Sequence, residues 1–218
     1  ILPKQSIDWT AIDAKADGSF LMEVYPSNIS NATTIEAQIK TIDGKNVGNA
    51  FSASFKKGDE KITIKTNIEN PDTWTPEFPN RYQVEVKLKN SQGTMHTITE
   101  KFGFRTVELR KGVGFFVNGQ KIMFKGVNRH SAWPTSGRTT SKDLSIADVK
   151  LMKEMNMNAV RMSHYPPDVH FLDVCDSLGL FVLDELTGWQ KKYDTPVGRK
   201  LLKEMVVRDV NHPSIVIW

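Results

Sequence analysis

The period of the hydrophobic pattern changes near Glu108, and this change constrains the fold more than any other feature of the sequence. From Ile7 to Glu108, apolar residues recur at every second position, most clearly between Tyr82 and Leu88. Such alternation is typical of antiparallel strands with one buried face. After Glu108, short apolar runs alternate with segments in which apolar residues recur at helical spacing. The sequence therefore predicts two domains of different class.

The first 108 residues contain roughly seven short strand patterns, which is typical of a β-sandwich. Turn sequences such as Asp17-Gly18 and Asp43-Gly44 separate them. Cys175 is the single cysteine of the chain and lies outside this region, so apolar packing alone must hold the sandwich together. We interpret Cys175 as a core residue of a later helix.

One stretch, "NPDTWTPEFPNRY", interrupts the strand pattern with three prolines around Trp74. It could be a crossing between two sheets, or Trp74 could form a platform on which a sugar stacks. We favour the crossing, because tryptophan is usually largely buried.

Residues 109–218 read as four apolar strands separated by three helices. The strands are expected at 122–127, 158–162, 180–185 and 214–218. Helices are expected after Ser141, after Asp168 and from Thr195-Pro196, each of which is a suitable helix start. Strands that are apolar throughout are parallel and covered on both faces. The first and third helices are expected to bury the following residues: Leu144, Ala147, Leu151, Met152 and Met155; Leu201, Leu202, Met205 and Val206.

A doubly wound sheet and a (β/α)₈ barrel both fit this alternation. A dinucleotide-binding sheet would carry a glycine-rich GxGxxG loop after its first strand, and "GVNRHSAWPTSGR" is not such a loop. Polar residues instead follow three successive strands, as expected at the rim of a barrel, where active sites lie. These residues are Asn128, Arg129 and His130; Arg161, Ser163 and His164; Asp184 and Glu185.

The residue types at these strand ends favour sugar binding over other chemistry. His164 and His170 are separated by a proline pair, and there is no HExxH or cysteine set for a metal. The sequence contains no GxSxG motif, so it does not predict a nucleophilic serine. Polar side chains beside aromatic rings suit the hydroxyl edge and apolar face of a sugar; the flanking aromatic residues are Trp133, Tyr165 and Trp189.

Charge and hydropathy exclude other partners. The 29 basic and 25 acidic residues are scattered, so the sequence does not predict a nucleic-acid interface. No apolar run approaches the ~20 residues that span a bilayer, so we expect no membrane insertion. Both ends look cut, so we expect a longer parent protein. A homo-oligomer is one option for that parent, and its compartment is the cytoplasm or the periplasm if it is bacterial.

Several long motifs together resemble glycoside hydrolase family 2, the family of β-galactosidases and β-glucuronidases. They are "NPDTWTPEFPNRY", "GFRTVEL", "FFVNGQKIMFKGVNRH", "NAVRMSHYP", "CDSLGLFVLDE" and "RDVNHPSIVIW". They occur in the family's order, from about Asn70 to the last residue. The resemblance implies an immunoglobulin-like β-sandwich at residues 1–108, followed at 109–218 by the first half, strands one to four, of a (β/α)₈ TIM barrel.

The resemblance also implies site residues. His130, Arg161 and His164 match sugar-contacting residues of the family, and Asp184 and Glu185 match a carboxylate pair that supports the substrate pocket. Trp133 and Trp189 are candidates for sugar stacking. Asp184 and Glu185 cannot both act on one bond, because neighbouring residues of a strand point to opposite faces.

The catalytic residues implied by the resemblance lie outside this chain. The family's acid/base glutamate is expected shortly after Trp218, and its nucleophile on a later strand. We therefore expect the chain to be a fragment of a retaining β-glycosidase, inactive by itself, whose partner is the C-terminal half of the barrel.

The expected substrate is an oligosaccharide or β-glycoside, and Arg129 within "GVNRH" favours β-galactosides over β-glucuronides. Magnesium-dependent members carry Glu-x-His after strand three, where this chain has "LTGWQKKYD", so we expect neither magnesium nor another cofactor. The alternative is a non-catalytic carbohydrate-binding or scaffold module that uses the same pocket. A nucleotide-using α/β enzyme is disfavoured by the missing phosphate loop.

Overall fold

The computed structural model describes residues 3–29, 34–56, 58–188 and 191–218. The chain forms two compact units, each built from two stretches of sequence. The first unit comprises residues 1–72 and 81–104, and the second comprises residues 73–80 and 105–218. The boundary expected after Glu108 falls inside strand β8, Val107–Arg110, whereas the units divide between Phe104 and Arg105.

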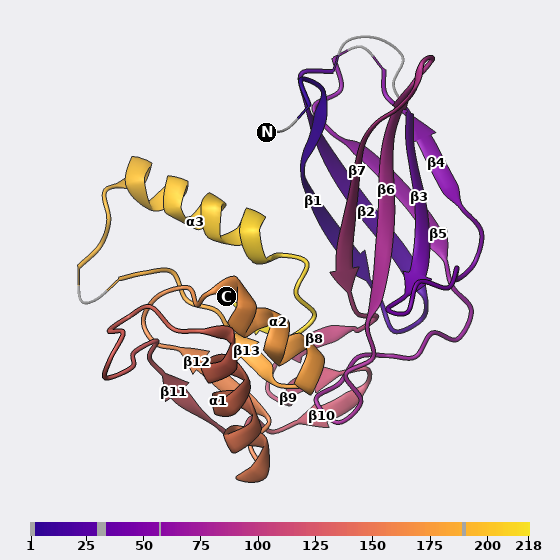
Figure 1. The fold of residues 1–218 in the computed structure, drawn as a ribbon. Coiled ribbons are helices and arrows are strands. Elements are labelled where there is room, and N and C mark those ends of the chain that lie inside the picture. The colour runs from indigo at the N-terminus through magenta and orange to yellow at the C-terminus, as the bar shows by residue number, and fades with distance from the viewer. Residues whose placement is uncertain (1–2, 30–33, 57, 189–190) are drawn as a thin grey trace. The chain divides into compact units, whose positions relative to one another are not determined.

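The first unit is an immunoglobulin-like sandwich of two antiparallel sheets (Figure 1). One sheet has the order β1-β2-β5 and the other the order β4-β3-β6-β7. The strands are β1 (Ser6–Ala14), β2 (Ser19–Ser27), β3 (Thr34–Thr41), β4 (Phe51–Ser54), β5 (Ile62–Asn67), β6 (Tyr82–Asn90) and β7 (Gly93–Phe102).

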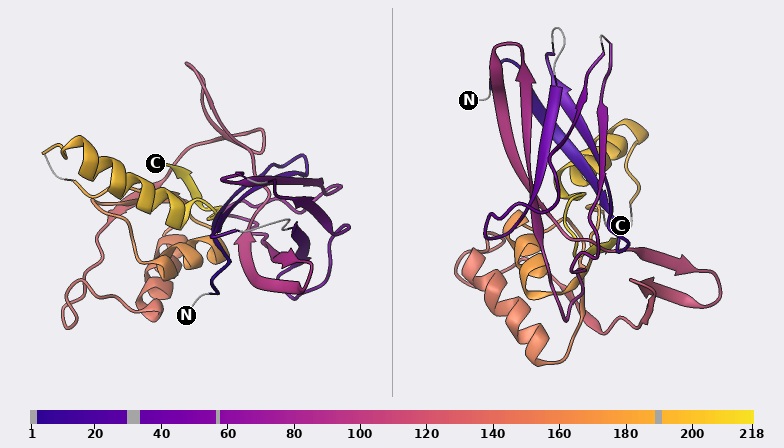
Figure 2. Two further views of the ribbon diagram at one scale, coloured as in Figure 1. Left: turned by 90° about the horizontal axis from the view of Figure 1, so that it is seen from above. Right: turned by 90° about the vertical axis from the view of Figure 1, so that its right-hand side faces the viewer.

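Alternating apolar residues of both sheets fill the space between them. In β6, every second side chain from Tyr82 to Leu88 is buried, as its period of two predicts. Three aromatic residues at the centre, Phe20, Phe102 and Phe104, are almost fully buried. The rings of Phe102 and Phe104 pack edge to face with centroids 5.3 Å apart, a favourable geometry for aromatic pairs. The left panel of Figure 2 shows this sandwich end-on.

The second unit contains a small antiparallel sheet and a four-stranded parallel sheet. In the small sheet, Asn118 and Gly119 form the expected hairpin turn, both with positive φ. The strands are β8, β9 (Gly114–Val117), β10 (Gln120–Ile122), β11 (Gly126–Arg129), β12 (Ala159–Met162), β13 (Phe181–Leu183) and β14 (Ile215–Ile217). The helices are α1 (Lys142–Glu154), α2 (Val169–Leu178) and α3 (Thr195–Asp209).

The parallel strands follow one another in chain order, β11-β12-β13-β14. A doubly wound sheet reverses its order at a switch point, whereas a barrel adds each new strand at the same edge. Residues of α1 and α2 pack with Val160, Met162 and Val182 on one face of the sheet. The order and this one-sided covering identify the start of a TIM barrel, with α1 and α2 on its outside.

Residues 73–80 and the loop before β8 close the amino end of the parallel sheet. Trp74 is fully buried, packs on Phe181 and donates its indole N–H to the carbonyl of Asp176 at 2.9 Å. The burial expected for Trp74 is therefore confirmed, and the sugar-platform alternative is wrong. The Arg105 guanidinium donates to the carbonyls of Pro213 and Ile215, the latter at 2.7 Å, and so fixes the entry into β14.

The helix ends follow the expected capping chemistry, with one exception. The Ser141 hydroxyl accepts from the Leu144 N–H, and Asp194 caps α3 one residue before Thr195-Pro196. Asp168 precedes α2 but makes no capping hydrogen bond. Gly179 ends α2 with a φ of 81° in contact with the Pro76 carbonyl, so that any Cβ would collide with it.

Two expectations for the second unit were wrong in detail. The first parallel strand was expected at 122–127 but lies at Gly126–Arg129, because Ile122 pairs with Phe115 in the hairpin. The helix faces also differ: α1 buries Ser145, Val149 and Met152, and α3 buries Met205 and Asp209. Leu151, Met155 and Leu202, all expected to be buried, are exposed. Among the described residues, no helix combines the length and apolar character that crossing a membrane requires.

Candidate sugar-binding site

The two faces of the parallel sheet differ in what they contact. Arg129 of β11 points to the helix side, where it is buried, pairs with Asp148 of α1 at 2.8 Å and lies over the ring of Phe171 in α2. Its neighbour Asn128 and Arg161 of β12 line the opposite, inner face of the sheet. Arg129 therefore holds the helices, whereas Asn128 and Arg161 face the barrel interior.

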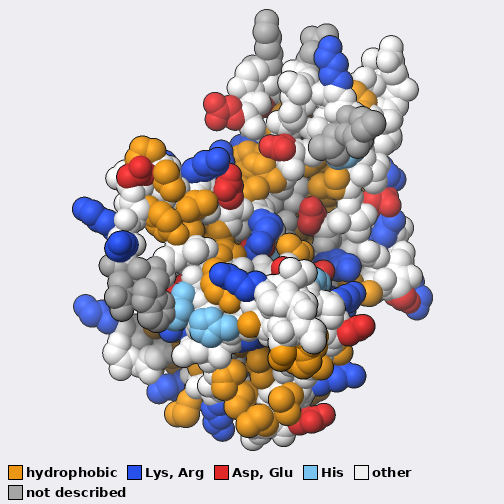
Figure 3. Space-filling view, turned by 60° about the vertical axis from the view of Figure 1, so that its left-hand side comes forward, with side chains coloured by type: hydrophobic (Ala, Val, Ile, Leu, Met, Phe, Trp, Pro, Cys, Tyr) orange, Lys and Arg blue, Asp and Glu red, His pale blue; other side chains and the backbone are white. Residues whose placement is uncertain are grey.

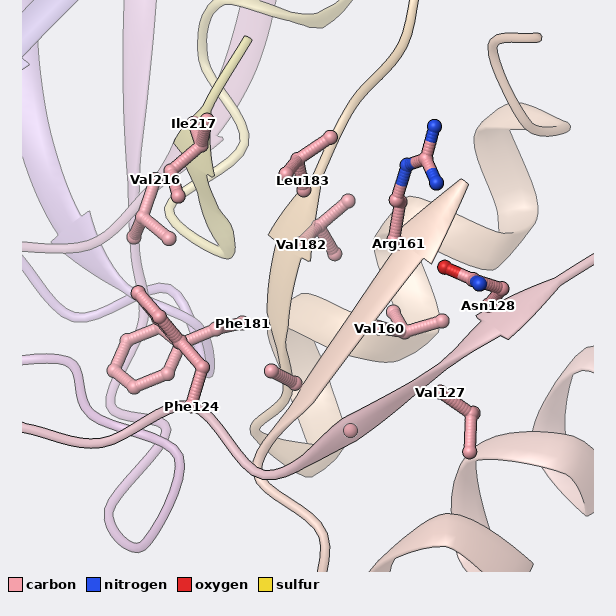
Figure 4. A pocket seen from close by; sticks show the side chains of 12 residues that line it. Phe124, Val127, Asn128, Val160, Arg161, Phe181, Val182, Leu183, Val216 and Ile217 are labelled. Carbon is pink, nitrogen blue, oxygen red and sulfur yellow. The ribbon is translucent and has the colours of Figure 1, made fainter. Parts of the chain in front are cut away.

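The inner face of the sheet forms a hollow of about 300 Å³. Its floor is apolar, and Figure 4 shows Phe124 and Phe181 at one end and Arg161 with Asn128 at the other. The apolar part matches the filled core of a TIM barrel. We therefore locate the candidate site at the carboxyl rim of the hollow. The lining residues are Phe124, Gly126, Val127, Asn128, Ala159, Val160, Arg161, Phe181, Val182, Leu183, Val216 and Ile217.

Three of the predicted residues form one ionic network at this rim. Arg161 donates to both carboxylate oxygens of Glu185, with distances of 2.7 Å from Nε and 3.1 Å from the terminal nitrogen. His164 Nδ1 lies 3.2 Å from Glu185 Oε1, which a protonated Nδ1 would use as its acceptor. All three side chains are partly exposed, so the network is open to a ligand.

The network keeps Glu185 charged. Partial burial raises the pKa of the Glu185 carboxyl, but the hydrogen bonds from Arg161 and His164 outweigh it and hold the pKa below its usual value. A charged carboxylate accepts hydrogen bonds from sugar hydroxyls, and charge-assisted bonds are stronger than neutral ones. The chemistry of this carboxylate suits binding, because a general acid needs a raised pKa.

His130 joins the network from the end of β11. Its ring is exposed and packs edge to face on His164, with centroids 5.4 Å apart. It also lies 6.1 Å from the ring of Tyr165, whose hydroxyl accepts from the Ser131 N–H at 3.0 Å. The structure thus brings His130, Arg161, His164 and Glu185 together. In the space-filling view, histidine side chains gather on the surface near lysine and arginine side chains (Figure 3).

Asp184 lies apart from this group, although the sequence predicted it as a site residue. It is fully buried, and its carboxylate accepts from the N–H of Glu185 at 2.9 Å. Burial, and next to it the charge of Asp209, raise the pKa of Asp184 to about 7. Arg208 binds Asp209 through two hydrogen bonds of 2.6 Å. Asp184 can therefore support the strand end behind Glu185 but does not reach the open rim.

The two predicted stacking residues have different outcomes. Trp133 is 47% exposed in the loop between β11 and α1, where it pairs with Gly137. Its role in stacking stays a prediction. Trp189 lies outside the described residues.

The strand-end pattern did not single out Arg138, whose guanidinium lies over the Tyr165 ring at 3.9 Å. This contact depends on how the loop after β11 folds, and the sequence carries no signal for it. The pair Arg208 and Asp209 was also missed. Their adjacency in "RDVNHPS" was the available signal.

One group of described residues has the spacing of metal ligands, and it lies at the amino end of the sheet. Ligand atoms of Asp173, Asp176 and His212 are within 4.8 Å of one another. Asp176 already binds His212 Nδ1 at 2.6 Å and the Ser214 N–H at 3.0 Å. A metal there would have to displace these contacts. His164 and His170 do not form a common site, since His170 contacts Ser145 of α1 instead.

A β-sandwich followed by sequential parallel strands with polar residues at their carboxyl ends defines a multidomain protein with a TIM-barrel domain. Sequence comparison gives the same answer. The family model "Glycosyl hydrolases family 2" matches residues 5–105, and "Glycosyl hydrolases family 2, TIM barrel domain" matches residues 107–198. The chain belongs to glycoside hydrolase family 2.

Individual relatives agree with this assignment. A β-galactosidase of Thermoanaerobacter pseudethanolicus is 35% identical over 210 residues, which cover 94% of this chain and 28% of that protein. A solved structure of a putative β-galactosidase from Bacteroides fragilis is 26% identical with a TM-score of 0.86, covering 97% of this chain and 34% of that one. A β-glucuronidase structure from Bacteroides uniformis is 25% identical with a TM-score of 0.81, covering 98% and 28%. The chain spans between 16% and 28% of the length of four curated β-galactosidases that it matches.

Proposed function

We propose that the protein containing this chain is a retaining β-glycosidase that acts on β-galactosides, and that this chain supplies part of its sugar-binding pocket. The observation that carries the proposal is the network of Glu185 with Arg161 and His164, open at the rim beside His130. Four relatives of 35% to 39% identity are described as β-galactosidases, which supports this choice of sugar.

In this proposal, the network binds and orients the sugar. The charged Glu185 accepts hydrogen bonds from two hydroxyl groups, and Arg161 holds its carboxylate plane in place. His164 and His130 add ring nitrogens that can donate or accept according to tautomer. The tightly positioned network reduces the loss of freedom on binding, which is the cost that preorganised sites avoid.

We further propose that the 218-residue chain does not hydrolyse glycosides by itself. A retaining glycosidase needs two carboxyl groups about 5–5.5 Å apart, one acid and one nucleophile. Glu185 is committed to Arg161 and His164, and Asp184 is buried apart from the rim. Asp184 and Glu185 are therefore not placed to act as the acid and the nucleophile on one glycosidic bond.

The test is a titration of the ¹⁵N-labelled chain with methyl β-D-galactoside, followed by NMR. We expect saturable shifts at amides around His130, His164 and Glu185, and their loss in the His164→Ala variant. Arg110→Gln is a matched control in the small antiparallel sheet and should bind like the unmodified chain. No saturable shift at any of these amides in the unmodified, folded chain would contradict the proposed binding role. Sustained release of p-nitrophenol from an aryl β-galactoside by the purified chain would contradict the proposed inactivity.

A non-catalytic carbohydrate-binding module that uses the same pocket is the alternative. Assay of the whole protein distinguishes the two. A hydrolase releases sugar with retention of anomeric configuration, whereas a binding module shows saturable binding without turnover.

A further inference from the structure

Arg208, in the last turn of α3, makes three hydrogen bonds with its guanidinium group. Two of them run in parallel to the carboxylate of Asp209, both at 2.6 Å. The third goes to the backbone carbonyl of Pro167 at 2.9 Å. The side chain of Asp209 is fully buried, whereas that of Arg208 is 39% exposed. Parallel bonds between a guanidinium and a carboxylate fix the orientation of both groups, so Arg208 is held in a position from which it reaches Pro167.

The Pro167 carbonyl belongs to the loop between β12 and α2, which presents His164. Two prolines, Pro166 and Pro167, follow His164 and Tyr165 in this loop. Each proline ring fixes the φ angle of its own residue, so the backbone between His164 and the bond to Arg208 has little freedom. Anchoring the Pro167 carbonyl therefore limits where the ring of His164 can lie.

Asp209 connects Arg208 to the strand end that presents Glu185. The Asp184 carboxyl is fully buried and close enough to Asp209 to share a hydrogen bond, which requires a proton on one of the two groups. Asp184 also accepts a hydrogen bond from the backbone N–H of Glu185 at 2.9 Å. Neighbouring residues of a strand point to opposite faces, so the buried carboxyl pair holds this strand end from behind. Arg208 thus contacts both the loop of His164 and the support of Glu185.

Apolar packing between α3 and these loops is incomplete. A hollow of about 180 Å³ separates the helix from the loops that follow β12 and β13. Pro166 and Leu186 line it from the loops, and Leu201, Met205 and Arg208 line it from the helix. Side chains around a void lose the contacts that a filled interior would give them. The hydrogen bonds of Arg208 are therefore needed to fix the loops where packing does not.

We infer that Arg208 is a positioning residue for the sugar-binding network, because it holds the loop of His164 and the strand end of Glu185 at a fixed separation. The inference rests on the proposed sugar-binding function. An arginine that only neutralised Asp209 would need the two parallel bonds alone, whereas the bond to Pro167 extends its hold to the loop. Without Arg208, these side chains would have to be ordered when the sugar binds, and this ordering reduces affinity.

The test is the affinity of the folded, ¹⁵N-labelled chain for methyl β-D-galactoside, measured by NMR. The double variant Arg208→Met with Asp209→Asn removes both charges, so that no ion is left buried without its partner. We expect it to bind about five- to tenfold more weakly, since the network is no longer preorganised. The amide signals of His164 and Tyr165 should shift even without sugar. Arg199→Met removes an exposed arginine of the same helix and, as the matched control, should leave both measurements unchanged.

A conservative variant separates positioning from stability. Arg208→Lys keeps a cation beside Asp209 but lacks the planar fork that reaches two partners, so it should fold and bind about two- to threefold more weakly. Unchanged affinity in the double variant, or in Arg208→Lys if the double variant does not fold, would overturn the inference while the proposed function stands. Weaker binding with unmoved His164 and Tyr165 amides would also overturn it. Failure of the unmodified chain to bind the galactoside would overturn the proposed function, and the inference with it.

Discussion

At the amino end of the parallel sheet, Asp176 binds His212 at 2.6 Å, and both side chains are almost fully enclosed. At the carboxyl end, Glu185 binds Arg161 and His164, and these side chains are 20% to 41% exposed. Both groups pair a carboxylate with cationic or titratable partners, and both come from motifs that carry the family resemblance. At the amino end, the two side chains use each other as hydrogen-bond partners and are shielded from solvent. At the carboxyl end, the side chains remain accessible to a ligand.

The comparison shows that residue type alone does not separate stability from function in a barrel. Residues at the amino end of barrel strands usually serve stability, and those at the carboxyl end serve activity. Asp176 also accepts from the Ser214 N–H at 3.0 Å, so it anchors the entry into β14. The Glu185 carboxylate instead contacts the side chains of Arg161 and His164.

The largest expected effect comes from breaking the amino-end group. Asp176→Ala leaves His212 and the Ser214 N–H without their acceptor inside the protein, and removing one partner of a buried pair costs about 3–5 kcal/mol. Urea unfolding should show this loss in the free energy of unfolding. Asp173→Asn is the matched control on the same helix and should change it by less than about 0.5 kcal/mol. A loss below about 1 kcal/mol for Asp176→Ala would mean that the two ends do not differ as described.

The next effect is a pH dependence that originates behind Glu185. The pKa of Asp184 rises from 3.8 to about 7 on folding, mainly through burial and then through Asp209. The folded state therefore binds this proton more tightly, so the free energy of unfolding should fall as pH rises from about 4 to about 7, by roughly 2–4 kcal/mol. Above pH 7 this contribution levels off.

Asp184→Asn tests this dependence, because an amide imitates the protonated carboxyl and cannot ionise. The variant should lose the decline between pH 4 and 7 and should equal or exceed the unmodified chain in stability at pH 8. Unfolding curves recorded at half-unit pH steps measure it. Parallel declines in both proteins would show that Asp184 is not the group responsible.

A smaller effect on stability, with a clear effect on binding, is expected at the carboxyl end. Glu185→Gln keeps the shape of the side chain but removes the charge that Arg161 and His164 face. Binding of methyl β-D-galactoside should weaken about tenfold, equivalent to about 1.4 kcal/mol. The free energy of unfolding should change by less than about 1 kcal/mol, since partly exposed ion pairs contribute little. The reverse result, a large stability loss with unchanged affinity, would make this network structural.

The smallest expected effect is that of chelation. Glu185 is engaged by Arg161 and His164, and Asp176 by His212 and Ser214, so we expect sugar binding to need no magnesium. Titration after dialysis against EDTA should give the same affinity as titration with added Mg²⁺. A severalfold loss of affinity after EDTA treatment that only added Mg²⁺ reverses would establish a metal requirement.

Much of the fold follows from the sequence because its signals are local. The period-two strands of the first unit and the hairpin at Asn118-Gly119 depend on neighbouring residues, and they form where expected. The first parallel strand did not form where expected. Ile122 pairs with Phe115 in the hairpin, and Phe124 packs on Phe115 and Phe181. Those contacts bring together segments that no local pattern relates.

The helix faces and the site show the same division. In α1, the buried Ser145 bonds His170 at 3.0 Å, so a polar residue occupies the core face while Leu151 remains exposed. The meeting of His130, Arg161, His164 and Glu185 was predictable, since the carboxyl ends of parallel strands meet at one rim. Arg129 and Asp184 also stand at strand ends but are buried away from the rim. The place of Arg138 was not predictable, because its position depends on a loop conformation.

The membership of residues 73–80 in the second unit has a consequence for how such proteins can be recombined. The backbone passes from one unit to the other three times, at 72–73, at 80–81 and at 104–105. A chimera joined only at residue 105 would take residues 73–80 from the sandwich donor. This segment, here called the plug, carries the Trp74 that packs on Phe181. Swaps between homologues should therefore succeed only when the donor's plug fits the recipient's barrel. The sandwich and the barrel are then expected to evolve as a matched pair.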